Sequence, residues 1–259
     1  MKIFFILGED SFFKPKFVES IIKKRRKDIV GVAVVPAKTP KTNLIKYIKK
    51  QLALFGYWNF FVLGIQIELH KFFDRISKFF PIKRFYSVKS VVKKYGLLLL
   101  LPMDINDSQF LERLRKIKPD IIVSSCPQIF KKELLSIPRF GCINRHTSLL
   151  PQYGGLMPVF WAMLNDEKEI GVTMHKMNEG IDEGQIITQK KIYLSEGDSL
   201  YGLYKKCFEI SSGLVLEAIE IIEKKKKFKV INKNKERTYH SFPKKEDVKL
   251  FRKKSKKYL

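Results

Sequence analysis

Side chains able to donate, accept or carry a proton gather in one stretch of the sequence, residues 141–186. An apolar run of β character, residues 140–143, leads into Asn144 and His146, which are separated by one residue. Residues spaced by two point to the same side of an extended strand, so the amide and the imidazole should face the same way. A carboxylate, Asp182, follows in a downstream turn. Together they offer a donor for a developing oxyanion, a ring that titrates near neutral pH and a charge that can orient that ring.

The segments around these residues resemble a known family. They are Asn144-Arg145-His146, Ser148-Leu149-Leu150-Pro151, Gly171-Val172-Thr173 with His175, and Asp182 before Gly184 and Ile186. The set resembles the catalytic core of the folate-dependent formyltransferases, which act on glycinamide ribonucleotide, methionyl-tRNA or sugar nucleotides. The resemblance covers roughly residues 1–210 with one large insertion, and it implies a Rossmann-like, mostly parallel α/β sheet.

The resemblance also implies a chemistry for the three polar residues. A formyl group would pass from 10-formyltetrahydrofolate to an amine, with negative charge developing on the formyl oxygen. Asn144 would donate to that oxygen, and His146 would stabilise it or relay a proton. Asp182 would orient the imidazole and favour its protonated form, or hold a bridging water. His175 matches a position without catalytic duty, and Arg145 should face the opposite side of its strand.

Further site residues follow from the same resemblance. Main-chain atoms of two turns would bind the folate: Gln128, Ile129 and Phe130 in one, Gly180 and Ile181 in the other. A plain strand-to-helix turn is an equally good interpretation of the first. The loop expected to hold the amine substrate contributes Ser148, Tyr153 and Gly155. Many members of the family carry an arginine after this tyrosine, whereas Gly154 stands here. The substrate class is therefore less firmly indicated than the chemistry.

Apolar periodicity predicts the elements that position these residues. The strands expected before the site span residues 2–7, 29–35, 96–101, 120–125 and 140–144, and those after it span 171–177 and 185–193. The expected helices span residues 15–24, 87–95, 108–116, 159–164 and 199–222. Asn106 is a plausible cap for the helix at 108–116. The first turn, Gly8-Glu9-Asp10-Ser11, carries two carboxylates that would repel a phosphate, which argues against a role in purine synthesis.

An insertion at residues 37–85 interleaves basic and aromatic residues and predicts two or three amphipathic helices. A cover over the sheet or a contact in a homodimer is the favoured interpretation, followed by a substrate lid and then by a membrane-surface helix. The apolar window at 51–66 is shorter than a spanning helix needs, so no transmembrane segment is expected. The expected domains are a catalytic domain, 1–210, and a helix end with a basic tail, 211–259.

Composition limits the class of protein and its partners. The 259 residues are 45% hydrophobic, which fits a folded globular chain, and the formal net charge of +25 favours anionic partners. The simpler interpretation of that charge is a lysine-rich composition whose side chains are simply solvated. Three scattered cysteines indicate reduced thiols in a cytoplasmic protein, and Cys142 is expected to be a packed core thiol. The four histidines lack the spacing of metal ligands, so no metal is expected.

Three functions remain open at this point. The first is an N-formyltransferase whose acceptor is an amino sugar on a nucleotide. The second is a methionyl-tRNA or other RNA-directed formyltransferase, favoured by the charge but opposed by a tail too short for a further β-barrel. The third is a non-catalytic basic scaffold that binds membrane or nucleic acid. Basic residues cluster at 224–227 and 252–257 in the tail, where few stacking aromatics support a grip on nucleic acid. Residues 239–243 are expected to pack back near the site.

Overall fold

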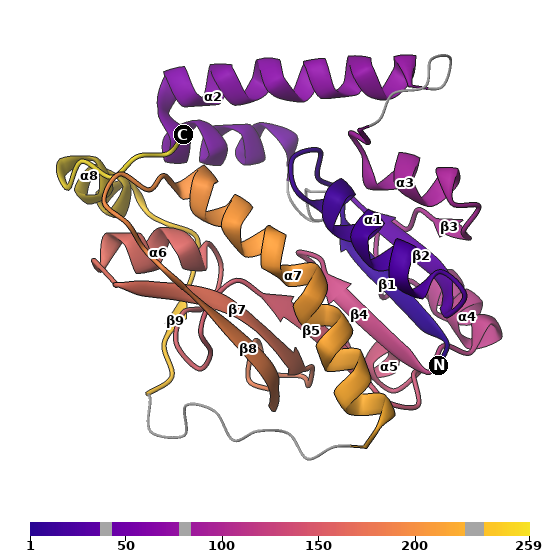
Figure 1. Cartoon of the computed structure of the whole chain (residues 1–259). Coiled ribbons are helices and arrows are strands. Elements are labelled where there is room, and N and C mark those ends of the chain that lie inside the picture. Colours follow the sequence, from indigo (N-terminus) through magenta and orange to yellow (C-terminus); the bar gives the residue numbers. More distant parts are fainter. Residues whose placement is uncertain (37–42, 78–83, 226–235) are drawn as a thin grey trace. The chain divides into compact units, whose positions relative to one another are not determined.

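The computed structural model describes residues 1–36, 43–77, 84–225 and 236–259 (Figure 1). Its contacts divide the chain into two compact units. The first unit comprises Met1–Leu44 and Phe61–Ile143, and the second comprises Ile45–Phe60 and Asn144–Leu259. The expected division into residues 1–210 and 211–259 stays a prediction.

Parallel strands make up the sheet of the first unit. β1 (Ile3–Gly8) pairs in parallel with β2 (Ile29–Val35) and with β4 (Ile121–Ser125), and β2 pairs in parallel with β3 (Leu99–Leu100). All six residues of β1 are buried, as a near-continuous apolar run predicts for a strand covered on both faces. The helices of this unit, besides part of α2, are α1 (Lys14–Arg25), α3 (Val88–Lys94), α4 (Ser108–Ile117) and α5 (Lys132–Leu135).

The second unit carries the strands that end at the polar cluster. β5 (Cys142–His146) enters it, and β7 (Glu169–Lys176) pairs with β8 (Ile186–Tyr193) in antiparallel register. Strand order is β3-β2-β1-β4 in the first unit; in the second it is β5-β7-β8, where β5 contributes its residues from Asn144 onward. These seven mostly parallel strands confirm the predicted α/β class. The other elements are β6 (Gly154–Gly155), α6 (Pro158–Leu164), α7 (Leu200–Glu223), β9 (Tyr239–His240) and α8 (Lys245–Lys253).

The insertion forms α2 (Leu44–Ile76), a run of 33 residues with non-helical backbone at Gly56, so it is two helical pieces (Figure 1). Residues 37–42 and 78–83 of the expected insertion lie outside the described residues. By length and composition α2 could cross a membrane, with a mean hydropathy of 1.4 in its most apolar window, of which 6% is buried. The sequence estimate that this apolar segment is too short was therefore wrong, and the absence of a transmembrane segment stays a prediction.

Two local features differ from the sequence expectations. The cap of α4 is Asp107 and not Asn106, because the Asp107 carboxylate accepts hydrogen bonds from the backbone N–H groups of Gln109 and Phe110. Asn106 instead donates to the carbonyl of Ile129 and accepts from Lys131 N–H. The tail contains the helix α8, for which the basic composition gave no signal; residues 226–235, with two of the four residues of the first basic cluster, lie outside the described residues.

Candidate active site

Asp182 is the centre of the polar cluster, which lies wholly in the second unit. Its Oδ2 lies 3.5 Å from His146 Nδ1, and its Oδ1 accepts from Asn144 Nδ2 at 3.4 Å. The backbone N–H of Gly155 donates to Oδ2 at 2.9 Å. Asn144 and His146 reach the carboxylate from one side of β5, as their alternation predicts. Asp182 itself stands between β7 and β8 with φ at 54°, in the left-handed region. The structure thus brings the three predicted residues together.

The neighbours of Asp182 keep it ionised. Burial alone would raise the pKa of this carboxyl, but the His175 and His146 rings and the Gly155 N–H favour the charged form. The pKa of Asp182 therefore ends well below its usual range. A fixed negative charge in a buried cluster stabilises a positive charge that forms beside it, which is what a transient imidazolium requires.

His146 is held in a defined tautomer. Its Nε2 lies 2.8 Å from the carbonyl oxygen of Tyr153, an atom that only accepts, so this nitrogen carries a hydrogen. In the neutral ring, Nδ1 then presents its lone pair toward Asp182. Burial lowers the pKa of His146, while Asp182 and the Tyr153 carbonyl raise it in part. The ring is therefore neutral at rest, and Nδ1 is the atom that can take up a proton.

His175 belongs to the same cluster, although the sequence gave it no catalytic duty. Its Nδ1 lies 2.8 Å from the carbonyl oxygen of Lys176, an atom that only accepts, so this nitrogen carries a hydrogen. The Nε2 atom of the ring lies 3.3 Å from Asn144 Nδ2 and 3.4 Å from Asp182 Oδ1. The buried ring thus orients the Asn144 amide. The signal in the sequence was the alternation of Thr173 and His175 on β7, but it could not show that this face of β7 meets the end of β5.

The remaining residues of β5 serve packing. Arg145 faces the opposite side, where its Nε donates to Ser211 Oγ at 2.7 Å and its guanidinium lies 3.8 Å from the centre of the Phe208 ring. This confirms that Arg145 points away from Asn144 and His146. Cys142 is buried, and burial raises the pKa of its thiol to about 12. Such a thiol is not a nucleophile near neutral pH, as expected of a packed core residue.

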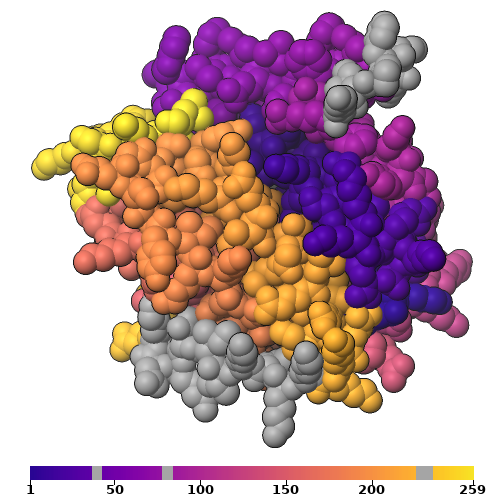
Figure 2. Space-filling view, viewed as in Figure 1, coloured from indigo at the N-terminus to yellow at the C-terminus, as the bar shows by residue number. Residues whose placement is uncertain are grey.

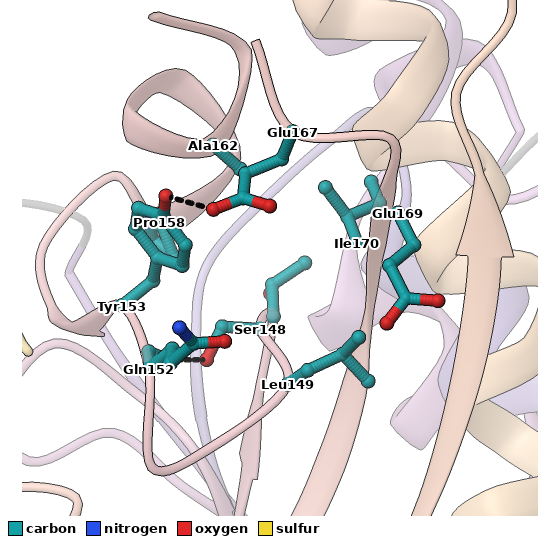
Figure 3. A pocket seen from close by; sticks show the side chains of 10 residues that line it. Ser148, Leu149, Gln152, Tyr153, Pro158, Ala162, Glu167, Glu169 and Ile170 are labelled. Carbon is teal, nitrogen blue, oxygen red and sulfur yellow. Dashed lines mark hydrogen bonds between the residues drawn. The ribbon is translucent and has the colours of Figure 1, made fainter. Parts of the chain in front are cut away.

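The loop expected to hold the amine substrate borders a pocket (Figure 3). Ser148 and Tyr153 are among its ten lining residues; Asn144, His146 and Asp182 are not. The Tyr153 hydroxyl donates to Glu167 Oε1 at 2.6 Å, and the Ser148 hydroxyl donates to the carbonyl of Gln152 at 2.8 Å. Both hydroxyls therefore fix the shape of the loop. The expected contacts of Ser148, Tyr153 and Gly155 with substrate stay predictions.

Residues 238–240 run beside this loop, and Tyr239 and His240 belong to the segment 239–243 that the sequence predicts to pack near the site. β9 pairs with β6, and Tyr153 N–H donates to Thr238 Oγ1 at 2.8 Å. The His240 ring stacks between Tyr153, at 5.3 Å, and Trp161, at 4.7 Å. This segment therefore packs along the loop. The loop supplies two hydrogen-bonding partners of the cluster, the Tyr153 carbonyl and the Gly155 N–H.

Gly155 must be glycine for two reasons. Its φ is +91°, a conformation that side chains strongly disfavour, and a Cβ there would clash with the carbonyl oxygen of His240. The close approach of β6 to β9 therefore depends on this residue, and so does the position of the N–H that donates to Asp182.

The expected folate turns lie in different units. In the first unit the buried Gln128 side chain accepts from Ile105 N–H and donates to the Met103 carbonyl, so the turn has a fixed conformation. Ile129 is exposed and Phe130 is buried. In the second unit Gly180 and Ile181 precede Asp182, and the Ile181 carbonyl accepts from Arg237 Nη2 at 3.0 Å. Pterin binding by these residues stays a prediction.

The backbone N–H groups that a phosphate would need at the first turn already donate to a carboxylate of the turn itself. Asp10 Oδ1 accepts from the backbone N–H groups of Phe12, Phe13 and Lys14 at the start of α1. The Glu9 carboxylate accepts from Val88 N–H, and burial raises its pKa. The positive end of α1 is therefore occupied by the chain itself, which agrees with the expectation that no phosphate binds there.

Over the described ranges of the chain, no three His, Cys, Asp or Glu side chains are grouped so as to hold a metal ion. The cluster of Asn144 and Asp182 offers hydrogen-bond donors, two imidazole rings and one fixed charge.

Comparison with known proteins identifies the surrounding sequence. A family model described as formyl transferase matches residues 80–219. A methionyl-tRNA formyltransferase of Thermodesulfovibrio yellowstonii is 38% identical over 138 residues, which are 53% of this chain and 45% of that protein. The chain spans about half the length of this relative and of a methionyl-tRNA formyltransferase of Caldanaerobacter subterraneus.

Solved structures share the fold. Glycinamide ribonucleotide transformylase 1 of Symbiobacterium toebii superposes with a TM-score of 0.59 at 18% identity, covering 93% of this chain and 95% of that one. The N-formyltransferase of Helicobacter canadensis, in complex with folinic acid and dTDP-3-aminofucose, superposes with a TM-score of 0.58 at 20% identity, covering 93% and 71%. At such identities the likeness concerns the fold alone.

Proposed function

Because the chain belongs to the formyl transferase family, we propose that it is an enzyme that transfers a formyl group from 10-formyltetrahydrofolate to a primary amine. The observation that carries this proposal is the buried cluster in which Asp182 joins Asn144 and His146. The donor set fits a neutral formamide, because the cluster offers N–H groups for an oxygen that becomes negative and a base for an amine proton.

Each residue of the cluster has a distinct task in this proposal. Asn144 directs one N–H of its amide to the formyl oxygen as charge develops there; loss of such a donor typically costs about 10²–10³ in rate. His146 accepts the amine proton on Nδ1, since its Nε2 is already bonded to the Tyr153 carbonyl. Asp182 stabilises the imidazolium that results. His175 is a positioning residue, because it acts through the Asn144 amide.

For the acceptor we propose an amino sugar carried by a nucleotide. Two features of the second unit support it. The stacked rings of Tyr153, His240 and Trp161 lie along the loop next to the cluster, and such rings suit a flat base. Arg237 is half-exposed and pairs with Glu183, the residue after Asp182, so a cation lies close to the cluster. An anionic, base-bearing substrate matches both features.

Methionyl-tRNA is the second candidate acceptor. The sequence relative of 38% identity bears that name, and a net charge of +25 suits a polyanion. The first turn, whose backbone N–H groups donate to Asp10, does not distinguish between these two acceptors. It argues against glycinamide ribonucleotide as the acceptor.

The test supplies the purified protein with 10-formyltetrahydrofolate and a panel of acceptors, and it measures the formylated product by mass spectrometry. We expect turnover of a nucleotide-linked amino sugar. Efficient formylation of methionyl-tRNA alone would select the second candidate. Calorimetry with a stable folate analogue serves as the companion measurement. A well-folded protein that binds no folate and formylates no amine would contradict the enzymatic function and leave the non-catalytic scaffold.

A further inference from the structure

A stripe of large apolar side chains lies on the exposed side of α2 in the first unit. It consists of Phe61, Ile65, Leu69 and Phe72, which are 59%, 45%, 48% and 55% exposed. At about 100° per residue these positions fall within an arc of about 80° and extend about 16 Å along the helix. Trp58, 74% exposed, belongs to the second unit and precedes Phe61 by three residues in the sequence. We call the four residues of the first unit the α2 stripe; Figure 2 shows α2, in purple, at the surface.

The opposite side of the helix is fixed to the first unit. The His70 ring packs against Phe12 and Tyr86, with ring centres 5.1 Å apart in both pairs. The Asp74 carboxylate accepts from the Ser87 hydroxyl at 3.1 Å. His70 and Asp74 lie about 100° or more around the helix from every member of the α2 stripe. These contacts determine which side faces the unit, so the exposure of the stripe does not result from a free rotation of the helix.

We propose that the α2 stripe binds the surface of an anionic lipid membrane. Contiguous exposed apolar side chains mark interaction sites, and aromatic residues on one side of a helix suit the region between headgroups and acyl chains. The charge of the chain is complementary to such a surface, with 51 basic and 26 acidic residues. A cation also lies beside α2: the Arg84 guanidinium is 5.2 Å from the centre of the Tyr86 ring, which stacks on Phe73 of the helix.

Self-association is a weaker account of the same surface. Two copies of a chain with a net charge of +25 repel each other, whereas anionic lipid neutralises that charge. A membrane-spanning role is also weaker, despite the length of α2. The backbone break at Gly56 interrupts the helix, and Asp74 with its bond to Ser87 would have to enter or border the hydrocarbon. A helix with one apolar and one anchored polar side lies on a membrane surface.

The first experiment measures binding of the full-length protein to vesicles. Neutral phosphatidylcholine vesicles are compared with vesicles that contain phosphatidylglycerol, at low and high salt. We expect binding to the anionic vesicles only, with release at high salt. The double variant Leu69→Gln with Phe72→Gln should weaken binding at least about tenfold, because two apolar insertions are lost. The matched control is Leu101→Gln with Met103→Gln, two residues of the same unit that are 56% and 61% exposed but lie outside α2.

The second experiment uses the fluorescence of Trp58, which precedes the first residue of the stripe by three positions in the sequence. The chain has two tryptophans, so Trp161→Phe leaves Trp58 as the single fluorophore. Anionic vesicles should shift its emission to shorter wavelength. Equal vesicle binding by the two double variants, or no shift, would overturn the proposal. Binding that resists high salt would indicate a spanning segment instead. Dimerisation that only the Leu69/Phe72 variant abolishes, without vesicle binding, would assign the surface to a second copy.

Discussion

At the residue scale, the cluster depends on which atoms of each side chain are already bonded. His146 Nε2 is occupied by the Tyr153 carbonyl, so its proton chemistry is confined to Nδ1. The Asn144 amide faces both His175 and Asp182 at distances of 3.3 and 3.4 Å, which are long for strong hydrogen bonds. One N–H group of the Asn144 amide can therefore bind an oxyanion instead, with little loss of free energy. These atoms and their charges lead to two predictions at this scale.

The first prediction is that Asp182→Asn slows turnover about tenfold to a hundredfold and changes the pH profile. Asp182 raises the pKa of His146 against the larger effect of burial, so removal of its charge lowers that pKa further. The acid limb of kcat/KM should move to lower pH. Melting temperature measured in parallel controls for unfolding. An acid limb that stays in place would show that His146 does not set the profile.

The second prediction concerns stability and pH. Burial holds the pKa of His146 below its ordinary value of 6.5, so below pH 6.5 the unfolded chain takes up a proton that the folded chain refuses. Stability should fall as the pH falls, by at most about 1.4 kcal/mol per pH unit from this group. His146→Asn should flatten that slope between pH 6.5 and 5 in denaturant titrations. Because burial also lowers the pKa of His70 and His240, some slope should remain in the variant. An equal slope in both proteins would contradict the account.

At the element scale, β6 and β9 hold the catalytic loop through backbone contact. Because burial on both faces leaves a clear signal in sequences such as that of β1, apolar runs predicted strands at β1 to β5, β7 and β8 and most helices, but neither β6 nor β9. The contact between His240 and Tyr153 joins residues far apart in the chain and has no local signal, although the isolated segment at 239–243 pointed to it. The cap of α4 was misplaced by one residue, since Asn106 and Asp107 are both good caps and only the backbone path selects Asp107.

The third prediction tests the contact between β6 and β9. Gly155→Ala places a methyl group against the His240 carbonyl and strains a φ of +91°. Gly197→Ala is the matched control, because its φ is +87° and nothing lies within 4 Å of the added Cβ. The control should lose about 1 kcal/mol of unfolding free energy, and Gly155→Ala about 2 kcal/mol more. Gly155→Ala should also lose activity, since the N–H that donates to Asp182 shifts. Equal losses in the two variants would show that the contact adds nothing.

At the scale of the whole molecule, the charge of +25 acts on every anionic partner, whatever the acceptor. Composition could indicate this attraction, and the spacing of a few residues could indicate the chemistry. Neither could show that the apolar residues of α2 share an exposed side, because that depends on the anchoring of His70 and Asp74. The sequence also could not identify the acceptor, because the loop departs from the family pattern at Gly154.

The fourth prediction separates charge from specificity. We expect tRNA to bind weakly and without sequence preference, with an affinity that falls steeply as salt rises because counterions are released. Filter binding across a salt series gives the slope, and a formylation assay with charged initiator tRNA gives the specificity. We expect no formylation of this tRNA, and its efficient formylation would instead identify a tRNA-directed enzyme, whose affinity for tRNA would also fall steeply with salt.

The central claim is that Asn144, His146 and Asp182 form one catalytic unit, and single-turnover formyl transfer to the identified amine tests it most directly. His146→Ala should lose about 10²–10⁴ in rate, and Asn144→Ala about 10²–10³ with folate affinity nearly unchanged. The double change His146→Ala with Asp182→Asn should be little slower than His146→Ala alone, because residues that act as a unit are not additive. A well-folded His146→Ala protein with a near-normal rate would contradict the assignment of this site.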